Sequence, residues 1–497
     1  MALIESLISI DKKQPVSAYV QVANGIITYI RQGTLKPGAA LPASRVLAKS
    51  LNVHRKTIVA AYDELYAQSW VDVYPRKGIF VANNLPDVSP RPILDDVQQQ
   101  TGLACETNFD VEKTIDIAYP FHKAPEGNII MNGGFPDIRI APVDLMIREY
   151  RRFAAYHFTT KYLMYGLEQG SENLRNELAK FLSETRGLQV QASDILITKG
   201  VQMALYLTAQ LLISKGDIVI AADPGFSGAN DVFEQAGAKL ELVPVDDYGI
   251  SVDAIEEICK KKKVRIVYVI PHHHTPTTAT LCPERRMRLL ELARKHRFAI
   301  IEDDYDFDFQ YTSSPILPLA SADYCGNVIY VGSFCKIIAP GIRIGFMVAP
   351  KNLLSQAINL RRLIDRQGEH LLEEAMANLL KNGDIGRHLK KANKLYHERR
   401  DMLCKLLTEH LGEHISFKIP DGGFAIWVTY LNGLKPAKVA EKASEMGLTL
   451  SDGSDYYYNP KYQNHSIRIG FASLNEAEMI EAISILKKAI DKVLSGS

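Results

Sequence analysis

The most informative stretch of this chain is Ser333-Phe334-Cys335-Lys336, which Arg343 follows seven residues after the lysine. Directly before it, residues 327–332 form an apolar run, Asn-Val-Ile-Tyr-Val-Gly, with the composition of a strand. A lysine amine and an arginine guanidinium therefore follow the end of one predicted strand. In open α/β sheets, ligands bind beyond the carboxyl ends of the strands, so this stretch predicts a site for an anionic ligand.

A second strand-like run supplies a carboxylate and a phenol. Residues 298–301 lead directly into Glu302-Asp303-Asp304-Tyr305. Asp303 and Tyr305 share a face of extended chain, because alternate residues point the same way. With Lys336 and Arg343 they provide the groups needed to hold pyridoxal 5′-phosphate (PLP) as an imine of the lysine. Asp303 would keep the pyridine nitrogen protonated, and Tyr305 would reach the ring hydroxyl.

Such a site also needs an uncharged amine, a stacking ring and a phosphate cradle. We expect burial and the nearby cation of Arg343 to lower the pKa of Lys336 and free its amine. Phe226 follows a strand-like run and is well placed to stack on a flat ligand. Gly200 precedes a helix expected over about residues 203–213, and the free N–H groups at such a helix start suit a phosphate.

From residue 128 onward the pattern is that of an α/β fold. Apolar strand-like runs alternate with amphipathic helices, which is typical of a mainly parallel sheet covered by helices. A length of 497 residues with 46% hydrophobic and 23% charged residues favours a globular protein of more than one domain. Residues 83–127 have weak periodicity and several prolines, which indicates a linker. The predicted domains are therefore 1–82 and 128–497.

Residues 1–82 predict a winged helix-turn-helix. They hold ten Lys/Arg against five Asp/Glu, although the net charge of the chain is only +1. A helical repeat covers residues 16–32, a short helix follows with Ser44 as its N-cap, and a third helix begins near His54-Arg55-Lys56-Thr57. Two strand-like runs then form a hairpin with Pro75-Arg76-Lys77 at its tip. In such DNA-binding modules the recognition helix offers its first residues to the bases.

This order of motifs resembles a GntR-type DNA-binding domain over residues 13–82. The shared motifs are Leu-Pro-x-Ser-Arg, Leu-Ala, Leu-x-Val, Arg-x-Thr, Ala-Tyr-x-x-Leu and a wing with Gly-x-Phe-Val. The resemblance implies double-stranded DNA as a partner, with base or backbone contacts from Arg45, Arg55 and Thr57 and phosphate contacts from Lys56, Arg76 and Lys77. The chain departs from this family at His54, where a small hydroxyl residue is common, so the resemblance supplies no helix cap there.

The C-terminal part, about residues 128–490, resembles a fold-type I PLP-dependent aminotransferase, and the whole order resembles the MocR/GabR family of regulators. The resemblance implies that Lys336 bonds to the cofactor and that Phe226 stacks on its ring, with Asp303 and Tyr305 as partners of the pyridine nitrogen and ring oxygen. The implied phosphate ligands are Val201, Gln202, Ser333 and Arg343, with Tyr165 arriving from the second subunit of a homodimer. Arg468 would grip the carboxylate of a small amine or amino-acid effector, because a guanidinium offers two parallel donors.

Two departures weaken the resemblance to efficient aminotransferases. The turn from His273 to Thr278 replaces an Asn-Pro-x-Gly-type turn, so the asparagine hydrogen bond to the ring oxygen is missing and Thr278 stands for a flexible glycine. Cys335 stands where a serine is common, and a thiol is a weaker phosphate donor than a hydroxyl. Neither change prevents cofactor binding.

Other site classes are disfavoured by spacing. The six cysteines lack C-x-x-C spacing, as expected of reduced thiols. The three histidines at 272–274 would face alternating sides with no acidic ligand adjacent, so no metal site is predicted. No run of about 18 apolar residues and no signal-peptide start are present, which predicts a cytoplasmic, nucleoid-associated protein without membrane contact.

Two functions remain open from the sequence. The chain is either a transcription regulator that senses an amine, an amino acid or PLP itself, or an active PLP-dependent aminotransferase with an accessory DNA-binding domain. A complete helix-turn-helix has no use in a pure enzyme, which favours the regulator. Residual aminotransferase activity is compatible with either function.

Overall fold

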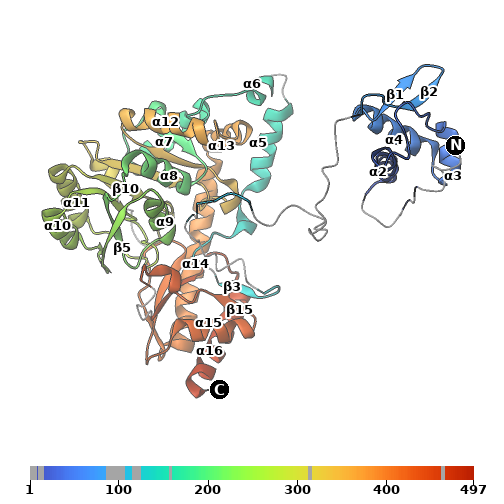
Figure 1. The fold of residues 1–497 in the computed structure, drawn as a ribbon. Helices are drawn as coiled ribbons and strands as arrows, with labels where there is room; N and C mark the ends of the chain where they lie inside the picture. Colours follow the sequence, from blue (N-terminus) through green and yellow to red (C-terminus); the bar gives the residue numbers. More distant parts are fainter. Residues whose placement is uncertain are drawn as a thin grey trace. The chain divides into compact units, whose positions relative to one another are not determined.

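The computed structural model describes residues 8, 10, 16–85, 107–112, 114, 125–131, 133–155, 159–311, 316–459 and 465–496. The chain forms two compact units, Met1–Glu112 and Lys113–Ser497 (Figure 1). The division between them falls within the predicted linker at 83–127. Most of that linker lies outside the described residues, so its boundaries stay predictions.

The first unit is a winged helix-turn-helix, as the sequence predicts. Its elements are α2 (Ala18–Arg31), α3 (Ser44–Ser50), α4 (Arg55–Ala67), β1 (Val71–Tyr74) and β2 (Gly78–Val81). The two strands are antiparallel, with Val71 opposite Val81. Apolar side chains at helical spacing on α2 and α4 meet Trp70 in one core, which includes Ile26 and Ile58. Packing of the helices on the hairpin therefore holds the unit together.

The helix starts of this unit differ from expectation. The prediction that Ser44 is an N-cap is wrong, because Ala43 takes that position and Ser44 is the first residue of α3. The Ser44 hydroxyl instead accepts a hydrogen bond from Arg55 Nε over 3.3 Å. His54 is the N-cap of α4, and its Nδ1 accepts a hydrogen bond from the Lys56 N–H over 3.2 Å. The imidazole thus provides the cap that a small hydroxyl residue provides in the resembling family.

The second unit is built on a seven-stranded sheet with the order β4-β12-β11-β10-β9-β5-β6. Its strands are β4 (Ile195–Thr198), β5 (Ile218–Ala222), β6 (Lys239–Val243), β9 (Val264–Val269), β10 (Ala299–Asp303), β11 (Val328–Ser333) and β12 (Gly345–Val348). Neighbouring strands are parallel except where β12 pairs with β11 and with β4. The predicted α/β fold with a mainly parallel sheet is confirmed.

Helices cover both faces of the sheet because successive strand residues point to opposite sides. Val219 and Ile266 belong to the core shared with α8 (Val201–Leu212), whereas their neighbours Ile220 and Val267 belong to a second core. Figure 1 shows α8 on one side of β5 and α10 and α11 on the other. The helices around the sheet also include α9 (Ser227–Gln235), α10 (Val252–Lys261), α11 (Pro283–His296) and α12 (Lys351–Ile364). The helix expected at 203–213 begins two residues earlier, at Val201.

The last part of the chain forms a C-terminal subdomain, comprising residues 384–495 and the strand β3 (Ile129–Met131). Its elements are α14 (Asp384–Leu411), β13 (Ile415–Phe417), β14 (Ala425–Tyr430), α15 (Pro436–Glu445), β15 (Leu448–Leu450), β16 (Ser466–Gly470) and α16 (Glu476–Ser495). The strands β13, β14 and β16 form an antiparallel sheet, and β15 pairs in parallel with β3. The segment that directly follows the predicted linker is therefore part of this subdomain.

The remaining helices pack beside the large sheet. They are α5 (Val143–Ala155), α6 (Thr159–Leu163), α7 (Glu172–Arg186) and α13 (His370–Lys381), and a small hairpin is formed by β7 (Val245–Asp246) and β8 (Gly249–Ile250). Among these four helices, α13 packs most extensively against α5 and α7. In the described ranges, no helix is both long and apolar enough to cross a membrane.

Candidate functional site

The predicted site residues gather at one edge of the large sheet. Strands β4, β5, β9, β10 and β11 all run in the same direction, so their carboxyl ends lie together. Asp303 ends β10, Lys336 follows β11, and Phe226 is the N-cap residue of α9 after β5. Phe226 is half-buried against the core that contains α8. The topology therefore explains why residues more than a hundred positions apart in the sequence share one site.

Lys336 is held between the large sheet and the N-terminal end of the unit. Its Nζ donates a hydrogen bond to the Gly134 carbonyl over 2.9 Å and lies 4.0 Å from the centre of the Phe135 ring. Burial and the Arg468 cation lower the pKa of Lys336 to about 8. The expectation of a lowered pKa is met, but the cation responsible is Arg468 and not Arg343. An appreciable fraction of the amine is therefore uncharged near neutral pH.

Asp303 is prepared for a cationic partner. It is only 3% exposed, and its Oδ2 accepts a hydrogen bond from the Tyr268 hydroxyl over 2.8 Å. Its Oδ1 is buried and has no partner among the described residues. Burial raises the pKa of Asp303 to about 7. A protonated pyridine nitrogen would satisfy the orphaned oxygen and favour the carboxylate, so this residue fits PLP.

Tyr305 and Arg468 form a corner of the site together with Thr275. The Tyr305 hydroxyl donates to the His273 carbonyl over 3.0 Å and accepts from Thr275 Oγ1 over 2.9 Å and from Arg468 Nη2 over 3.0 Å. Arg468 Nη1 also donates to Thr275 Oγ1 over 2.7 Å, whereas Arg468 Nε has no partner in the described chain. Burial acts against the charge of Arg468, but Tyr305, Asp306 and Tyr456 together outweigh burial and raise the pKa of Arg468. Arg468 is therefore a buried cation with one donor to spare.

Thr275 was not among the residues predicted from the sequence. It lies in the altered turn after β9, where the sequence indicated only that an asparagine was missing. Its hydroxyl contacts both Tyr305 and Arg468. Thr278 in the same turn has φ 61°, a left-handed conformation that glycine adopts more readily. A threonine thus adopts a left-handed conformation in this turn, and Thr275 supplies a polar side chain to the site.

The predicted phosphate ligands converge around the start of α8. Gly200 is its N-cap with φ 80°, and a Cβ there would lie 2.6 Å from Arg343 Nη2, so only glycine fits. Arg343 Nη2 donates to the Lys199 carbonyl over 2.7 Å, and Nη1 lies 3.4 Å from Cys335 Sγ. The backbone N–H groups of Val201 and Gln202 open the helix beside this guanidinium. A helix N-terminus and an arginine together suit a phosphate.

Two other predicted phosphate ligands are engaged elsewhere. The Ser333 hydroxyl donates to the Ile344 carbonyl over 3.2 Å and accepts from the Cys335 N–H over 3.0 Å. Tyr165 is 71% exposed, and its ring lies under the Arg366 guanidinium at 4.0 Å. Tyr165 is therefore displayed on the surface of its own protomer.

The three histidines each have a different partner. His272 Nδ1 lies 2.9 Å from Asp304 and His273 Nδ1 lies 3.1 Å from Asp306, so the expectation that no acidic residue is adjacent is wrong. His274 Nδ1 lies 2.9 Å from the Thr277 hydroxyl. Burial and the Arg468 cation lower the pKa of His274 to about 3, which keeps it neutral. Among the described residues, no group of three His, Cys, Asp or Glu side chains is arranged for a metal ion.

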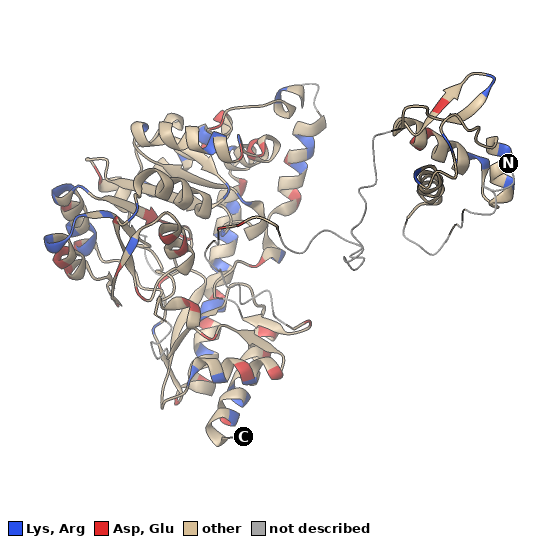
Figure 2. Cartoon of the chain, in the orientation of Figure 1, with Lys and Arg blue, Asp and Glu red and all other residues tan. Residues whose placement is uncertain are grey.

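The predicted DNA-contact residues lie in the first unit and are accessible. Arg45 on α3 and Arg55 and Lys56 at the start of α4 are exposed, and Thr57 is half-buried. Arg76 and Lys77 are exposed at the hairpin tip, where Arg76 has φ 65°. Figure 2 shows Lys and Arg positions in blue on the helices and the hairpin of this unit. Their contact with DNA itself stays a prediction.

Comparison with known proteins separates the chain into the same two parts. Residues 148–486 match the family described as aminotransferase class I and II, and residues 18–81 match the bacterial regulatory proteins of the gntR family. The chain is 28% identical over 486 residues to the probable rhizopine catabolism regulatory protein MocR of Rhizobium meliloti, covering 97% of this chain and 96% of that one. This relative has both parts in one chain.

Two relatives match the second unit alone. The aromatic-amino-acid aminotransferase 1 of Thermococcus litoralis is 30% identical and covers 73% of this chain and 88% of its own. The crystal structure of kynurenine aminotransferase from Pyrococcus horikoshii superposes with a TM-score of 0.70 at 30% identity, covering 74% of this chain and 92% of the other. The fold of the second unit is therefore that of PLP-dependent aminotransferases.

Proposed function

Since the chain belongs to the aminotransferase class I and II family and carries a GntR-family DNA-binding domain before it, we propose that it is a PLP-dependent transcription regulator that senses a small amine or amino acid. The observation that carries this proposal is the presence of both parts in one chain. An enzyme gains nothing from an exposed Arg55 and Lys56 at the start of a recognition helix. We accordingly infer a cytoplasmic location on the chromosome.

PLP, when bound, supplies an aldehyde for an amine and a ring that withdraws electrons. Lys336 provides the amine, and its lowered pKa supports that role. Asp303 holds a proton at the pyridine nitrogen through its free Oδ1. Tyr305 and Thr275 would hold the ring oxygen, and Phe226 would stack on the ring. The N–H groups at the start of α8 and Arg343 bind the phosphate, whereas Ser333 contributes through its position in the Lys336 loop.

The effector is recognised by Arg468. This guanidinium is 3% exposed, and a buried arginine with an unpaired Nε favours an anionic group such as a carboxylate. An amino acid would meet Arg468 with its carboxylate and compete with Lys336 through its amine. The resulting shift at the site would alter the grip of the winged helices on DNA.

We further propose that the regulator is a homodimer in which Tyr165 reaches the phosphate of the partner's site. Exposed apolar side chains on the same segment support an interface there, namely Leu163, Met164 and Leu167. The segment is fixed by a hydrogen bond of 2.6 Å from the Gly166 N–H to Gln367 Oε1. Sedimentation analysis should give a dimer. Tyr165→Phe should weaken PLP binding several-fold, and the variant should remain a dimer. A monomer with unimpaired PLP binding would contradict this arrangement.

An active aminotransferase is the second candidate, and the completeness of the site favours it. Lys336, Asp303 and Arg468 are all present, and Thr275 restores a polar group in the altered turn. Steady turnover of an amino donor and a keto acid at about 1 s⁻¹ or faster would support this function. Single conversion without turnover would leave the regulator as the function.

The decisive experiment screens amines and amino acids for a change in the visible absorbance of the cofactor-loaded protein. Binding to the DNA upstream of its own gene is measured in the same samples. An effector should change both signals at the same concentration. Lys336→Ala should lose the absorbance and the effector response but keep most of its DNA binding, and Lys351→Ala on the surface of α12 serves as the control. An absorbance change with no effect on DNA binding would contradict a sensor.

A further inference from the structure

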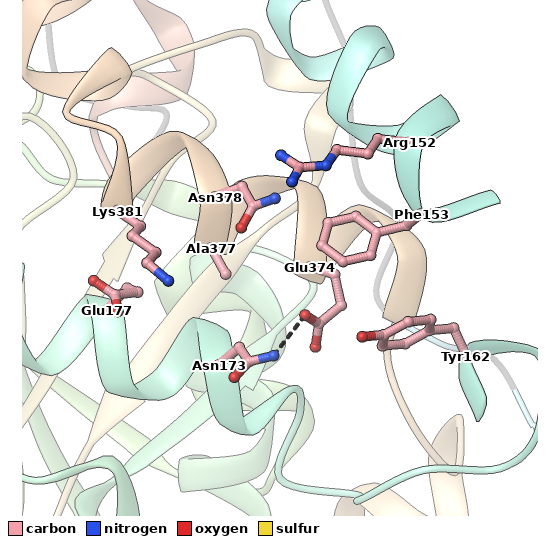
Figure 3. Close-up of a pocket in the computed structure, with 9 residues that line it drawn as sticks. All are labelled: Arg152, Phe153, Tyr162, Asn173, Glu177, Glu374, Ala377, Asn378 and Lys381. Atoms are coloured by element: carbon pink, nitrogen blue, oxygen red, sulfur yellow. Dashed lines mark hydrogen bonds between the residues drawn. The ribbon is translucent and has the colours of Figure 1, made fainter. Parts of the chain in front are cut away.

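A pocket of about 320 Å³ lies between α5, α6, α7 and α13 (Figure 3). The side chains that line it are Arg152, Phe153, Tyr162, Asn173, Glu177, Glu374, Ala377, Asn378 and Lys381. None of them belongs to the cofactor site. We propose that this pocket is a second ligand site for a small zwitterion, a molecule with an ammonium group at one end and a carboxylate at the other.

A buried carboxylate forms the base of the pocket. Glu374 is 6% exposed, and its oxygens accept hydrogen bonds from Ser171 Oγ over 2.5 Å and from Asn173 Nδ2 over 2.8 Å. Figure 3 shows the carboxylate pointing into the space between Asn173 and Tyr162. A carboxylate has about four acceptor positions, so two remain. Glu374 forms no ion pair within the described ranges, and both of its hydrogen-bond donors are uncharged. An ammonium group is the partner that it lacks.

Aromatic rings form one wall beside this carboxylate. Phe153 and Tyr162 meet edge to face with their ring centres 5.4 Å apart. Burial and the Glu374 carboxylate raise the pKa of Tyr162, so its hydroxyl stays protonated. Lys161 Nζ lies 5.8 Å from the centre of the Tyr162 ring, so one ammonium group is already held at this wall. The wall and the base therefore select the same charge.

The mouth of the pocket selects the opposite charge. Arg152 and Lys381 are both exposed there. The nearest carboxylate to Arg152 is Glu149 at 3.5 Å, a loose pair, and Lys381 has no ion-pair partner in the part of the chain that the structure describes. Glu177 also lines the pocket but pairs with Lys180 at 2.8 Å, so Arg152 and Lys381 leave the entrance attractive to a carboxylate. A zwitterion that enters with its ammonium group first satisfies both ends.

The pocket adjoins the segment that displays Tyr165. A smaller cavity of about 220 Å³ shares Tyr162, Asn173 and Glu374 with it and is also lined by Tyr165 and Gly166. The helix α6 joins the two directly in the chain. A ligand on Glu374 would therefore stabilise the segment on which the proposed dimer contact depends. The site itself does not rest on the proposed function.

The test uses the full chain loaded with PLP, after borohydride has added hydride to the carbon–nitrogen double bond that joins the cofactor to Lys336. Amines cannot exchange at that site afterwards. Titration calorimetry with 5-aminopentanoate as the probe should reveal one saturable site per protomer. Glu374→Gln keeps the size of the side chain and removes its charge, so the affinity should fall at least tenfold. Glu409→Gln makes the same change at an exposed position of α14 and should leave the affinity unchanged.

Two outcomes would overturn the proposal: no binding to the reduced protein, or equal affinity in Glu374→Gln. If Glu374→Gln melts early, the double variant Arg152→Gln, Lys381→Gln at the exposed mouth replaces it. That variant should bind at least fivefold more weakly, and an unchanged affinity would also overturn the proposal. Failure of the proposed function is distinguishable, because it shows as an absorbance change without an effect on DNA binding and leaves the effect of Glu374→Gln intact.

Discussion

At the scale of the residue, the corner of Thr275, Tyr305 and Arg468 sets what the cofactor site can recognise. All three polar groups contact one another within 3.0 Å. The sequence predicts Tyr305 from its spacing to Asp303 at the end of a strand, and the resemblance to aminotransferases implies Arg468. Thr275 follows no such rule, since only the folded turn after β9 brings its hydroxyl to Tyr305. The prediction that Arg343 lowers the pKa of Lys336 was wrong for the same reason. Tertiary contacts decide which cation lies near the amine, and they bring Arg468 there.

Removing the charge of Arg468 should raise the pKa of Lys336. Repulsion between the two cations favours the uncharged amine, and Arg468→Gln abolishes that repulsion. We expect the pH midpoint for the rate of PLP binding to cofactor-free protein to rise by roughly half a unit to one unit. The growth of the visible band after mixing, measured between pH 6 and pH 10, checks this. Arg468→Lys keeps the charge and should behave as wild type; an equal shift in both variants would contradict the electrostatic explanation.

Asp303 should make the cofactor-free protein less stable as the pH rises. Its carboxyl has a pKa of about 7 in the folded protein and 3.8 as its ordinary value, so the folded state binds the proton more tightly. The free energy of unfolding therefore falls between about pH 4 and pH 7, by at least about 1 kcal/mol. Urea denaturation at pH 5 and pH 7.5 measures the fall. Asp303→Asn should lack this part of the pH dependence, and the same fall in that variant would assign it to other groups.

At the scale of the element, helix starts carry much of the chemistry. The α8 start offers backbone N–H groups to the predicted phosphate, and the α4 start presents Arg55 and Lys56 from a histidine cap. Periodicity predicts that these helices exist but leaves their first residue uncertain by one or two positions. Ser44 shows the consequence, because the N-cap preference for serine points to position 44, whereas the last residue outside the helix is Ala43.

Loss of the His54 cap should loosen the first turn of α4. The hydrogen bond from the Lys56 N–H to His54 Nδ1 is worth about 1 kcal/mol at a helix start. His54→Ala should therefore speed amide exchange at residues 55–57 about fivefold. Hydrogen–deuterium exchange of the full chain, followed by mass spectrometry, gives the rates. His54→Ser supplies a hydroxyl cap and should restore slow exchange; fast exchange in wild type would indicate that the cap is not formed.

At the scale of the whole molecule, two units with separate chemistry share one chain. The sequence predicts both, because each has a series of motifs in a fixed order and each motif depends on local spacing. The pairing of β3 with β15 lies beyond such reasoning, since three-residue strands more than 300 positions apart have no periodicity to connect them. Subunit contacts also depend on surface shape, which spacing does not encode.

DNA binding should be separable from cofactor binding. Arg55 is exposed at the start of α4, and removal of a base or phosphate contact costs about 1–3 kcal/mol. Arg55→Ala should weaken binding to the DNA upstream of the gene by roughly five- to a hundredfold and leave the visible absorbance unchanged. Fluorescence anisotropy with labelled DNA and an absorbance spectrum of the same sample test this. Loss of the cofactor band in Arg55→Ala would contradict the division of labour.

The pairing of β3 with β15 determines which part of the second unit the linker to the DNA-binding unit is attached to. The strand β15 (Leu448–Leu450) pairs in parallel with β3 (Ile129–Met131). The chain after the linker therefore joins the C-terminal subdomain and not the large sheet. Arg468 lies in β16 of that same subdomain. The arginine proposed to bind the effector and the strand that anchors the linker thus belong to the same subdomain. Any rotation of this subdomain on ligand binding would therefore also move β3, the strand that follows the linker to the DNA-binding unit.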